Sequence, residues 1–137
     1  MCFAPLLLVG YLLTVQTSWH HTTSFDAPMG ELQTCETGAG MDIKASASGL
    51  YGLGLQYGWT WHDDRRSLTI QPKAGLSYVD HPEPALPLRT QFEVGLQLLF
   101  GYDRWRLGVE YWHLSNAGLK EPNIGLDLLV VQSGWTF

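Results

Sequence analysis

Apolar and polar side chains alternate along most of the chain after residue 49, and a period of two is that of a β-strand. From Tyr51 to Trp61 every second residue is leucine or aromatic, while the residues between them are glycine, glutamine or threonine. The same alternation recurs in four further segments, residues 67–79, 91–102, 105–113 and about 124–137. We therefore predict five strands in this part of the chain.

The length and contents of these segments indicate strands that cross a membrane rather than strands of a soluble sandwich. Their apolar rows extend over about a dozen residues, and a tilted transmembrane strand needs roughly 9 to 11. The opposite rows carry glutamine, lysine and glutamate at mid-strand, as the interior of a small barrel does. Aromatic residues gather near strand ends, where interfacial girdles lie; they are Trp59, Trp61, Tyr102, Trp105 and Trp135.

The connections favour an all-β fold of this kind, an antiparallel transmembrane β-barrel. The connections at residues 62–66 and around Asp103 are short, whereas those at residues 80–89 and 116–123 are long. Alternating short and long connections are typical of outer-membrane barrels. The chain also ends on Phe137, and a terminal aromatic residue in an amphipathic strand resembles the recognition signal of bacterial outer-membrane barrels. We expect the bacterial outer membrane as the location.

The number of strands depends on the N-terminal third. Single-chain bacterial barrels have an even number of strands and at least eight, so three strands must come from residues 1–48. The apolar block at the start of the chain has the length of a secretory h-region. We predict a possible signal peptide over residues 1–17 and a single barrel domain over residues 18–137; the alternative is that the block is itself a strand. Pro72 lies mid-strand, where it cannot donate a ladder hydrogen bond, and it predicts a bulge.

Composition narrows the range of partners. The formal net charge is −5 and the 8 basic residues are scattered, which argues against nucleic acid as a partner. No spacing expected for a zinc, phosphate-loop or dinucleotide site occurs, so we expect no metal and no cofactor. Glu93, Arg106 and Glu110 lie on inward rows, where we expect an interior salt-bridge network, and Trp112 is expected to plug the interior near the rim.

The outward row of the fourth segment ends in groups that are unusual on a lipid-facing surface. Continuing by twos from Tyr111 along this row gives His113 and then Ser115. Counting back by twos along the last segment from the terminal phenylalanine reaches Asp127. In a hairpin where Tyr111 opposes Leu129, His113 lies directly opposite Asp127, with Cβ atoms about 4.5 to 5.5 Å apart.

Serine, histidine and carboxylate are the parts of nucleophilic acyl transfer. The histidine takes the hydroxyl proton, and the carboxylate fixes the tautomer of the histidine and stabilises the imidazolium. Asn116, Asn123 and the backbone near Gly118 are candidate donors to an oxyanion. The alternative is that His113 is an ordinary interfacial residue and that Asp127 caps the loop or binds water at headgroup level.

The same stretch resembles a known family. HLSNAG at residues 113–118, followed by PN at residues 122–123 and the glycine at position 125, looks like the active-site signature of lipid A 3-O-deacylases, the PagL-type enzymes. The specific match covers residues 104–137, with weaker agreement of strand pattern from about residue 49. The resemblance implies an eight-stranded outer-membrane barrel that hydrolyses the 3-hydroxyacyl ester at position 3 of lipid A.

The resemblance also implies residue roles. His113 matches the family's catalytic base and Ser115 its nucleophile, and Asn116 with Gly118 falls where the oxyanion site is placed. Asn123 matches an asparagine of the motif. The third member of the triad departs from the family pattern, because Asp127 stands where the family has glutamate, one methylene longer.

These observations predict a carboxylic ester hydrolase with a Ser-His-Asp triad that acts on lipid A. The expected partner is lipid A or lipopolysaccharide of the outer leaflet around a membrane-embedded barrel, with a homodimer left open. Two alternatives remain. The first is a non-catalytic outer-membrane barrel, either a pseudoenzyme or a surface or adhesion module, and the second is an esterase that acts on other outer-leaflet phospholipids.

Overall fold

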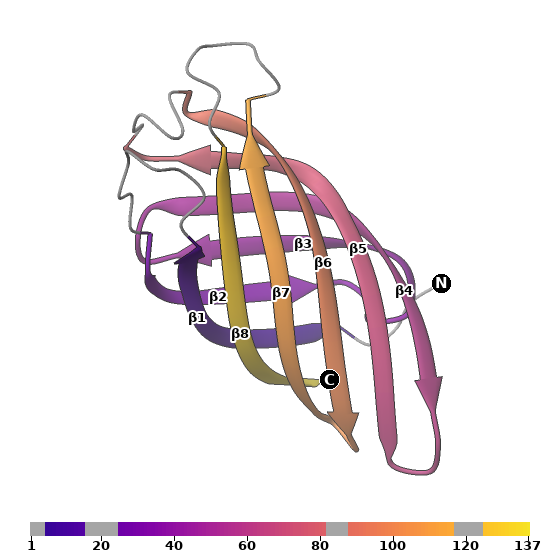
Figure 1. Ribbon diagram of the computed structural model, residues 1–137. Coiled ribbons are helices and arrows are strands. Elements are labelled where there is room, and N and C mark those ends of the chain that lie inside the picture. The colour runs from indigo at the N-terminus through magenta and orange to yellow at the C-terminus, as the bar shows by residue number, and fades with distance from the viewer. Residues whose placement is uncertain (1–4, 16–24, 82–87, 117–124) are drawn as a thin grey trace.

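The computed structural model is a closed barrel of eight antiparallel strands (Figure 1). The structure describes residues 5–15, 25–81, 88–116 and 125–137. The strands are β1 (Leu6–Val15), β2 (Ala27–Gln33), β3 (Gly38–Ser46), β4 (Leu50–His62), β5 (Arg66–Val79), β6 (Thr90–Tyr102), β7 (Trp105–Ser115) and β8 (Leu126–Thr136). They pair in chain order, and β1 pairs with β8 to close the barrel. The predicted eight-stranded barrel is confirmed.

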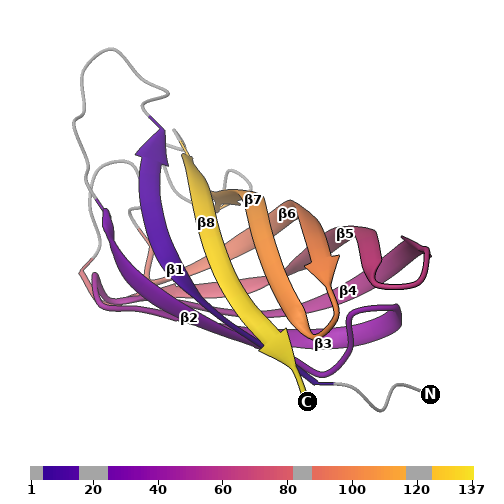
Figure 2. The ribbon, with the colours of Figure 1, turned by 90° about the horizontal axis from the view of Figure 1, so that it is seen from below.

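The apolar block at the N-terminus forms strand β1. Residues 6–15 are therefore a strand of the barrel, which was the alternative to a signal peptide. Leu6 pairs with Thr136 and Val15 pairs with Asp127, which sets β1 along the whole of β8 (Figure 2). Leu6, Leu8 and Leu12 on β1 point inward and are fully buried, while Val9, Tyr11 and Leu13 point outward. Because both faces of β1 are apolar, the strand shows no alternation of apolar and polar residues and looks like an h-region in the sequence. Without this strand the barrel would not close.

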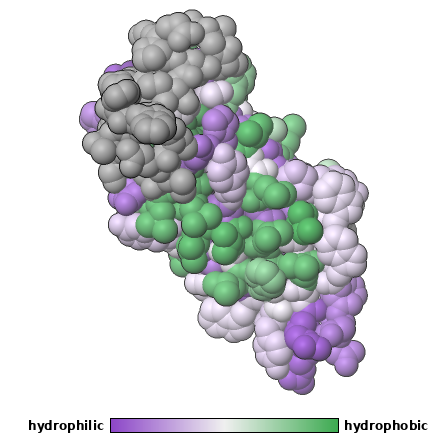
Figure 3. Space-filling model, in the orientation of Figure 1, coloured by the Kyte–Doolittle hydropathy of each residue, from purple (hydrophilic) through white to green (hydrophobic). Residues whose placement is uncertain are grey.

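The distribution of polarity is that of a membrane-spanning barrel, with an apolar exterior and a polar interior. On β4, Leu53 and Leu55 are exposed whereas Gln56, between outward residues, is buried. Figure 3 shows apolar side chains gathered in a band across the middle of one face, with hydrophilic residues at the tip of the β4–β5 hairpin. Within the described residues, no helix is long and apolar enough to cross a bilayer.

The interior is filled by paired charges, as predicted. Lys44 lies 2.6 Å from Asp42, 3.5 Å from Glu93 and 3.3 Å from Glu110. The Trp112 indole is 1% exposed and donates to Glu93 over 2.9 Å. Lys73 forms ion pairs with Glu31 and Glu110, and Arg106 pairs with Glu36 over 2.7 Å. The predicted interior salt-bridge network and the inward Trp112 are confirmed.

Pro72 does not create the predicted bulge. Gln56 pairs with Lys73 on one side of the proline, and Trp59 pairs with Ile70 on the other. The same number of residues lies between these pairs on both strands, so β4 and β5 keep one register. Pro72 also stays in register with Leu96 of β6. Pro72 has no N–H to donate, and the β4–β5 ladder accommodates it by leaving out the register pairs next to it, without an inserted residue.

The two ends of the barrel differ. The barrel runs diagonally in Figure 1: the last residues of β1, β3, β5 and β7 lie toward its upper left, called the upper end here, and the C-terminus lies toward the opposite, lower end. The lower end has the short turns at residues 34–37, 63–65 and 103–104. The end of β7 and the start of β8, which carry the predicted site, are at the upper end.

Candidate active site

Strand β7 presents the predicted histidine and serine on the outer face of the barrel. Trp112 and Leu114 point inward and are buried, whereas His113 and Ser115 between and beyond them are partly exposed. Alternation in a strand places the two partly exposed residues on the same face. The predicted outward facing of both residues is confirmed.

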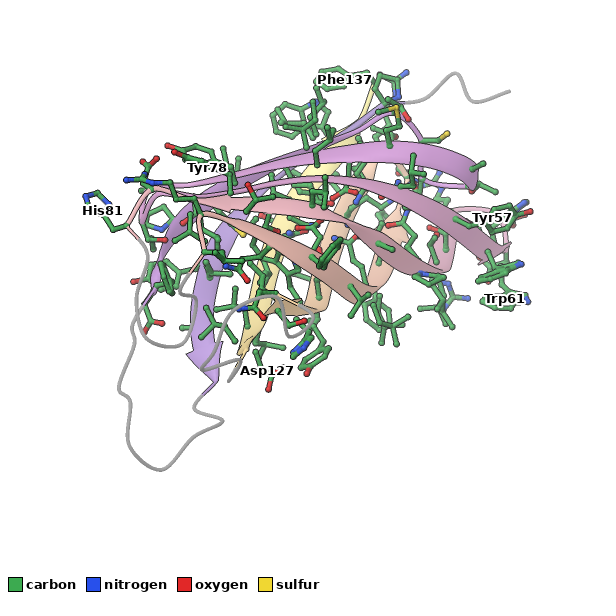
Figure 4. The ribbon with its side chains drawn as sticks, turned by 90° about the horizontal axis from the view of Figure 1, so that it is seen from above. Tyr57, Trp61, Tyr78, His81, Asp127 and Phe137 are labelled. Carbon is green, nitrogen blue, oxygen red and sulfur yellow. The ribbon has the colours of Figure 1, made fainter. Side chains whose placement is uncertain are left out.

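The register of the β7–β8 hairpin brings His113 and Asp127 together. Tyr111 pairs with Leu129, and His113 pairs directly with Asp127. This is the predicted register. Asp127 lies on the outer side of the barrel at the start of β8 (Figure 4). Two side chains that share one face at a register pair are close enough for contact.

The contact between the two side chains has the geometry of a base and its orienting carboxylate. His113 Nδ1 lies 2.6 Å from Asp127 Oδ1, and the side chains are 35% and 19% exposed. A carboxylate that accepts from Nδ1 fixes the imidazole tautomer and leaves Nε2 without a proton, as a general base requires. Partial exposure keeps the pair accessible from outside the barrel.

Asp127 has a second donor. The Tyr111 hydroxyl donates to the same Oδ1 atom that His113 contacts. Tyr111 precedes His113 by two residues on the outward row, so both side chains reach the carboxylate from one strand. The sequence placed Tyr111 only on the lipid-facing row and missed this contact.

Gly125 shapes the space on the other side of the imidazole. Its φ is +76°, in the left-handed region that favours glycine. A Cβ at this position would lie 3.2 Å from His113 Cε1 and 3.7 Å from Nε2, and 3.1 Å from the Leu114 carbonyl oxygen. Glycine at position 125 therefore keeps the Nε2 edge of the ring free of side-chain atoms from this position.

The remaining predicted residues are only partly described. Ser115 ends β7 and pairs in register with Phe92 of β6, and Asn116 follows it as a buried residue. Gly118 and Asn123, predicted for the oxyanion site and the motif, lie outside the described residues. The structure thus brings His113 and Asp127 into contact and places Ser115 on the same face, two residues from His113.

The family comparison covers nearly the whole barrel. The model of the family described as Lipid A 3-O-deacylase (PagL) matches residues 8–136. The chain belongs to this family. The match begins inside β1, which agrees with the assignment of the N-terminal block to the barrel.

A curated relative and two solved structures are also similar to the chain. Lipid A deacylase PagL of Bordetella bronchiseptica (strain ATCC BAA-588 / NCTC 13252 / RB50) is 56% identical over 32 residues, which span 23% of this chain and 17% of the relative's length. The crystal structure of the outer membrane enzyme PagL covers 96% of this chain and 98% of its own, with a TM-score of 0.58 and 15% identity. The match to the crystal structure of Ail, the attachment invasion locus protein of Yersinia pestis, covers 100% of this chain and 100% of Ail, with a TM-score of 0.54 and 13% identity. At these identities the two structures show the fold, the outer-membrane β-barrel.

Proposed function

We propose that this member of the PagL family hydrolyses the ester-linked 3-hydroxyacyl chain at position 3 of lipid A. The observation that carries the proposal is the His113–Asp127 pair, which faces outward at one end of a membrane barrel. If the end that carries the C-terminus faces the periplasm, this pair meets the acyl chains of the outer-leaflet lipid. Family membership supports the same substrate class.

In the proposed reaction Ser115 is the nucleophile. Its Oγ attacks the ester carbonyl carbon while His113 Nε2 takes the hydroxyl proton, and Asp127 stabilises the imidazolium. The tetrahedral intermediate expels the sugar hydroxyl, which receives the proton from His113, and an acyl-enzyme remains. Water activated by His113 then releases the 3-hydroxy fatty acid and restores Ser115.

The oxyanion of both steps needs hydrogen-bond donors close to Ser115. We assign this role to Asn116, Gly118 and Asn123 of the loop that joins β7 and β8. Asn116 directly follows Ser115 and is buried. We propose that its side-chain amide or its backbone N–H donates a hydrogen bond to the oxyanion that forms at the serine. No step of this scheme calls for a metal or a cofactor.

The fold itself does not choose between an enzyme and a surface module. The same barrel occurs in Ail, whose name describes attachment and invasion, and function has to be argued from the site. A non-catalytic barrel has no need of a histidine and a carboxylate in contact on its lipid-facing surface, where polar groups are costly. The His113–Asp127 pair therefore favours the hydrolase.

The test is a mass measurement on lipid A. Folded protein in detergent is incubated with lipid A, and wild type is expected to remove one 3-hydroxyacyl chain. Ser115→Ala is expected to lower the rate at least about 1,000-fold. Ser133→Ala is the matched control, because Ser133 is another outward serine, exposed on β8 beside Leu107 and away from the site; its activity should equal that of wild type.

Three results would contradict the proposal at different points. An inactive wild-type protein would reject the deacylase function in favour of the surface module. Equal activity of wild type and Ser115→Ala would reject Ser115 as the nucleophile. Lipid A that lacks the 3-linked chain should not be a substrate, and its cleavage would move the reaction to another ester.

A further inference from the structure

Two donors from one strand meet on a single carboxylate oxygen. Asp127 Oδ1 accepts from the Tyr111 hydroxyl and contacts His113 Nδ1 at 2.6 Å. Leu129, not Asp127, is the register partner of Tyr111. The tyrosine therefore reaches diagonally across the hairpin, a distance that long aromatic side chains can span.

The surroundings of Asp127 make the hydrogen bond from Tyr111 important for the stability of the carboxylate charge. The carboxylate lies on the outer face of the barrel, where bulk water does not fully solvate it, and a charge there is stable only with donors. Hydrogen bonds to an ionised carboxylate are among the stronger ones in proteins. Without Tyr111, only His113 among the described side chains would hold the carboxylate.

We propose that Tyr111 is a positioning residue of the esterase site and acts on His113 through Asp127. The inference rests on the proposed function. The phenol fixes the rotation of the carboxylate, so that Oδ1 stays aligned with Nδ1 throughout the reaction.

Removal of the hydroxyl should change the rate more than the binding of substrate. In Tyr111→Phe a less fixed carboxylate aligns the imidazole poorly, and kcat is expected to fall about 10- to 100-fold. KM is expected to change little, because the phenol contacts Asp127 rather than the substrate.

The experiment compares kcat and KM of wild type, Tyr111→Phe and the control Tyr51→Phe in the lipid A assay. Tyr51 is an outward tyrosine of similar exposure on β4, away from β7 and β8. A second pair of proteins, Asp127→Asn and Tyr111→Phe/Asp127→Asn, completes a double-mutant cycle. Because Tyr111 acts through the Asp127 carboxylate, its substitution should have no further effect on kcat once Asp127→Asn has removed that carboxylate.

The outcomes separate this inference from the proposed function. An inactive wild type overturns both. An active wild type with Ser115→Ala inactive and Tyr111→Phe identical to wild type in kcat and KM overturns only the role of Tyr111. That role is also overturned if Tyr111→Phe lowers kcat equally with and without the Asp127 carboxylate, since the effect would then be structural. A lower kcat at an unchanged KM, together with no further effect in the Asp127→Asn background, supports it.

Discussion

Two polar clusters lie back to back in the wall of this barrel and differ in what surrounds them. Along β7, Glu110 and Trp112 point inward, while Tyr111 and His113 point outward. The inward residues join a closed network of lysines and carboxylates that are almost completely buried. The outward residues contact Asp127 on a surface that remains accessible.

The difference shows that the role of a polar side chain in this barrel depends on whether the side chain points inward or outward, and not on its residue type. In the interior, cations and carboxylates compensate one another and no substrate reaches them, so their role is to fill and stabilise the barrel. On the exterior, the side chains of the His113–Asp127 pair remain 35% and 19% exposed. Variants on each side should therefore change different quantities, stability inside and rate outside.

The largest expected effect on stability comes from Lys44→Met. This change removes the cation that Asp42, Glu93 and Glu110 share. Breaking a buried ion pair by removing one partner costs about 3–5 kcal/mol, because a buried charge is left uncompensated. Urea unfolding in detergent, followed by tryptophan fluorescence, measures the loss. The activity per folded molecule should stay within about twofold of wild type.

A second substitution sharpens this prediction. Glu93→Gln in the Lys44→Met background removes the carboxylate for which Lys44 is the one cation among the described ion pairs, so it should restore part of the lost stability. A Lys44→Met protein that unfolds like wild type would show that the interior charges contribute little. A protein that keeps its stability but loses activity would show that the interior and the site are coupled.

The sequence predicted the face and the register of the site because both follow from local rules. A period of two fixes which side chains of β7 and β8 face outward, and the hairpin fixes that His113 opposes Asp127. The family resemblance of residues 113–125 rests on the same short stretch. The catalytic roles of Ser115, His113 and Asp127 remain predictions until the rates are measured.

The parts that the sequence did not predict depend on tertiary structure. β1 has leucines on both faces because its inward side packs against other apolar side chains rather than the polar network. β2 carries Pro28 and Gly30 on its outward row, so its alternation is hidden. The contact of Tyr111 with Asp127 crosses the hairpin diagonally, and no sequence period reports a diagonal contact.

Gly125→Ala should give the next largest effect, and it should lower kcat as well as the stability of the fold. A Cβ at position 125 would crowd His113 Cε1 and the Leu114 carbonyl oxygen. Displacing the imidazole by a few tenths of an ångström to about 1 Å is expected to lower kcat up to about 100-fold. The left-handed backbone adds a stability cost of about 1–2 kcal/mol.

Gly38→Ala is the matched control for this variant. Gly38 has a φ of +80°, but a Cβ there would meet nothing within 4 Å. It should show the same backbone cost in urea unfolding and no loss of kcat. Equal losses of kcat in both variants would mean that backbone strain, not the crowding of His113, controls the rate.

The smallest effect is expected from Asp63→Asn at the lower end of the barrel, where an ion pair faces solvent. Asp63 accepts from Arg66 over 2.9 Å, and the two side chains are 59% and 76% exposed. Hydrogen bonds from the Arg66 side chain and backbone lower the pKa of Asp63 below its ordinary value of 3.8. A lowered pKa stabilises the fold above that value, and the contribution is lost as the pH falls through the folded-state pKa.

Solvent screens this pair, so the urea midpoints of wild type and Asp63→Asn should differ far less at pH 7 than those of wild type and Lys44→Met. The remaining difference should vanish as the pH falls through the folded-state pKa of Asp63, which lies below 3.8. Activity should not change. If Asp63→Asn destabilised the barrel as much as Lys44→Met, burial would not be what separates the two kinds of ion pair, and the contrast between the interior network and exposed polar groups would fail.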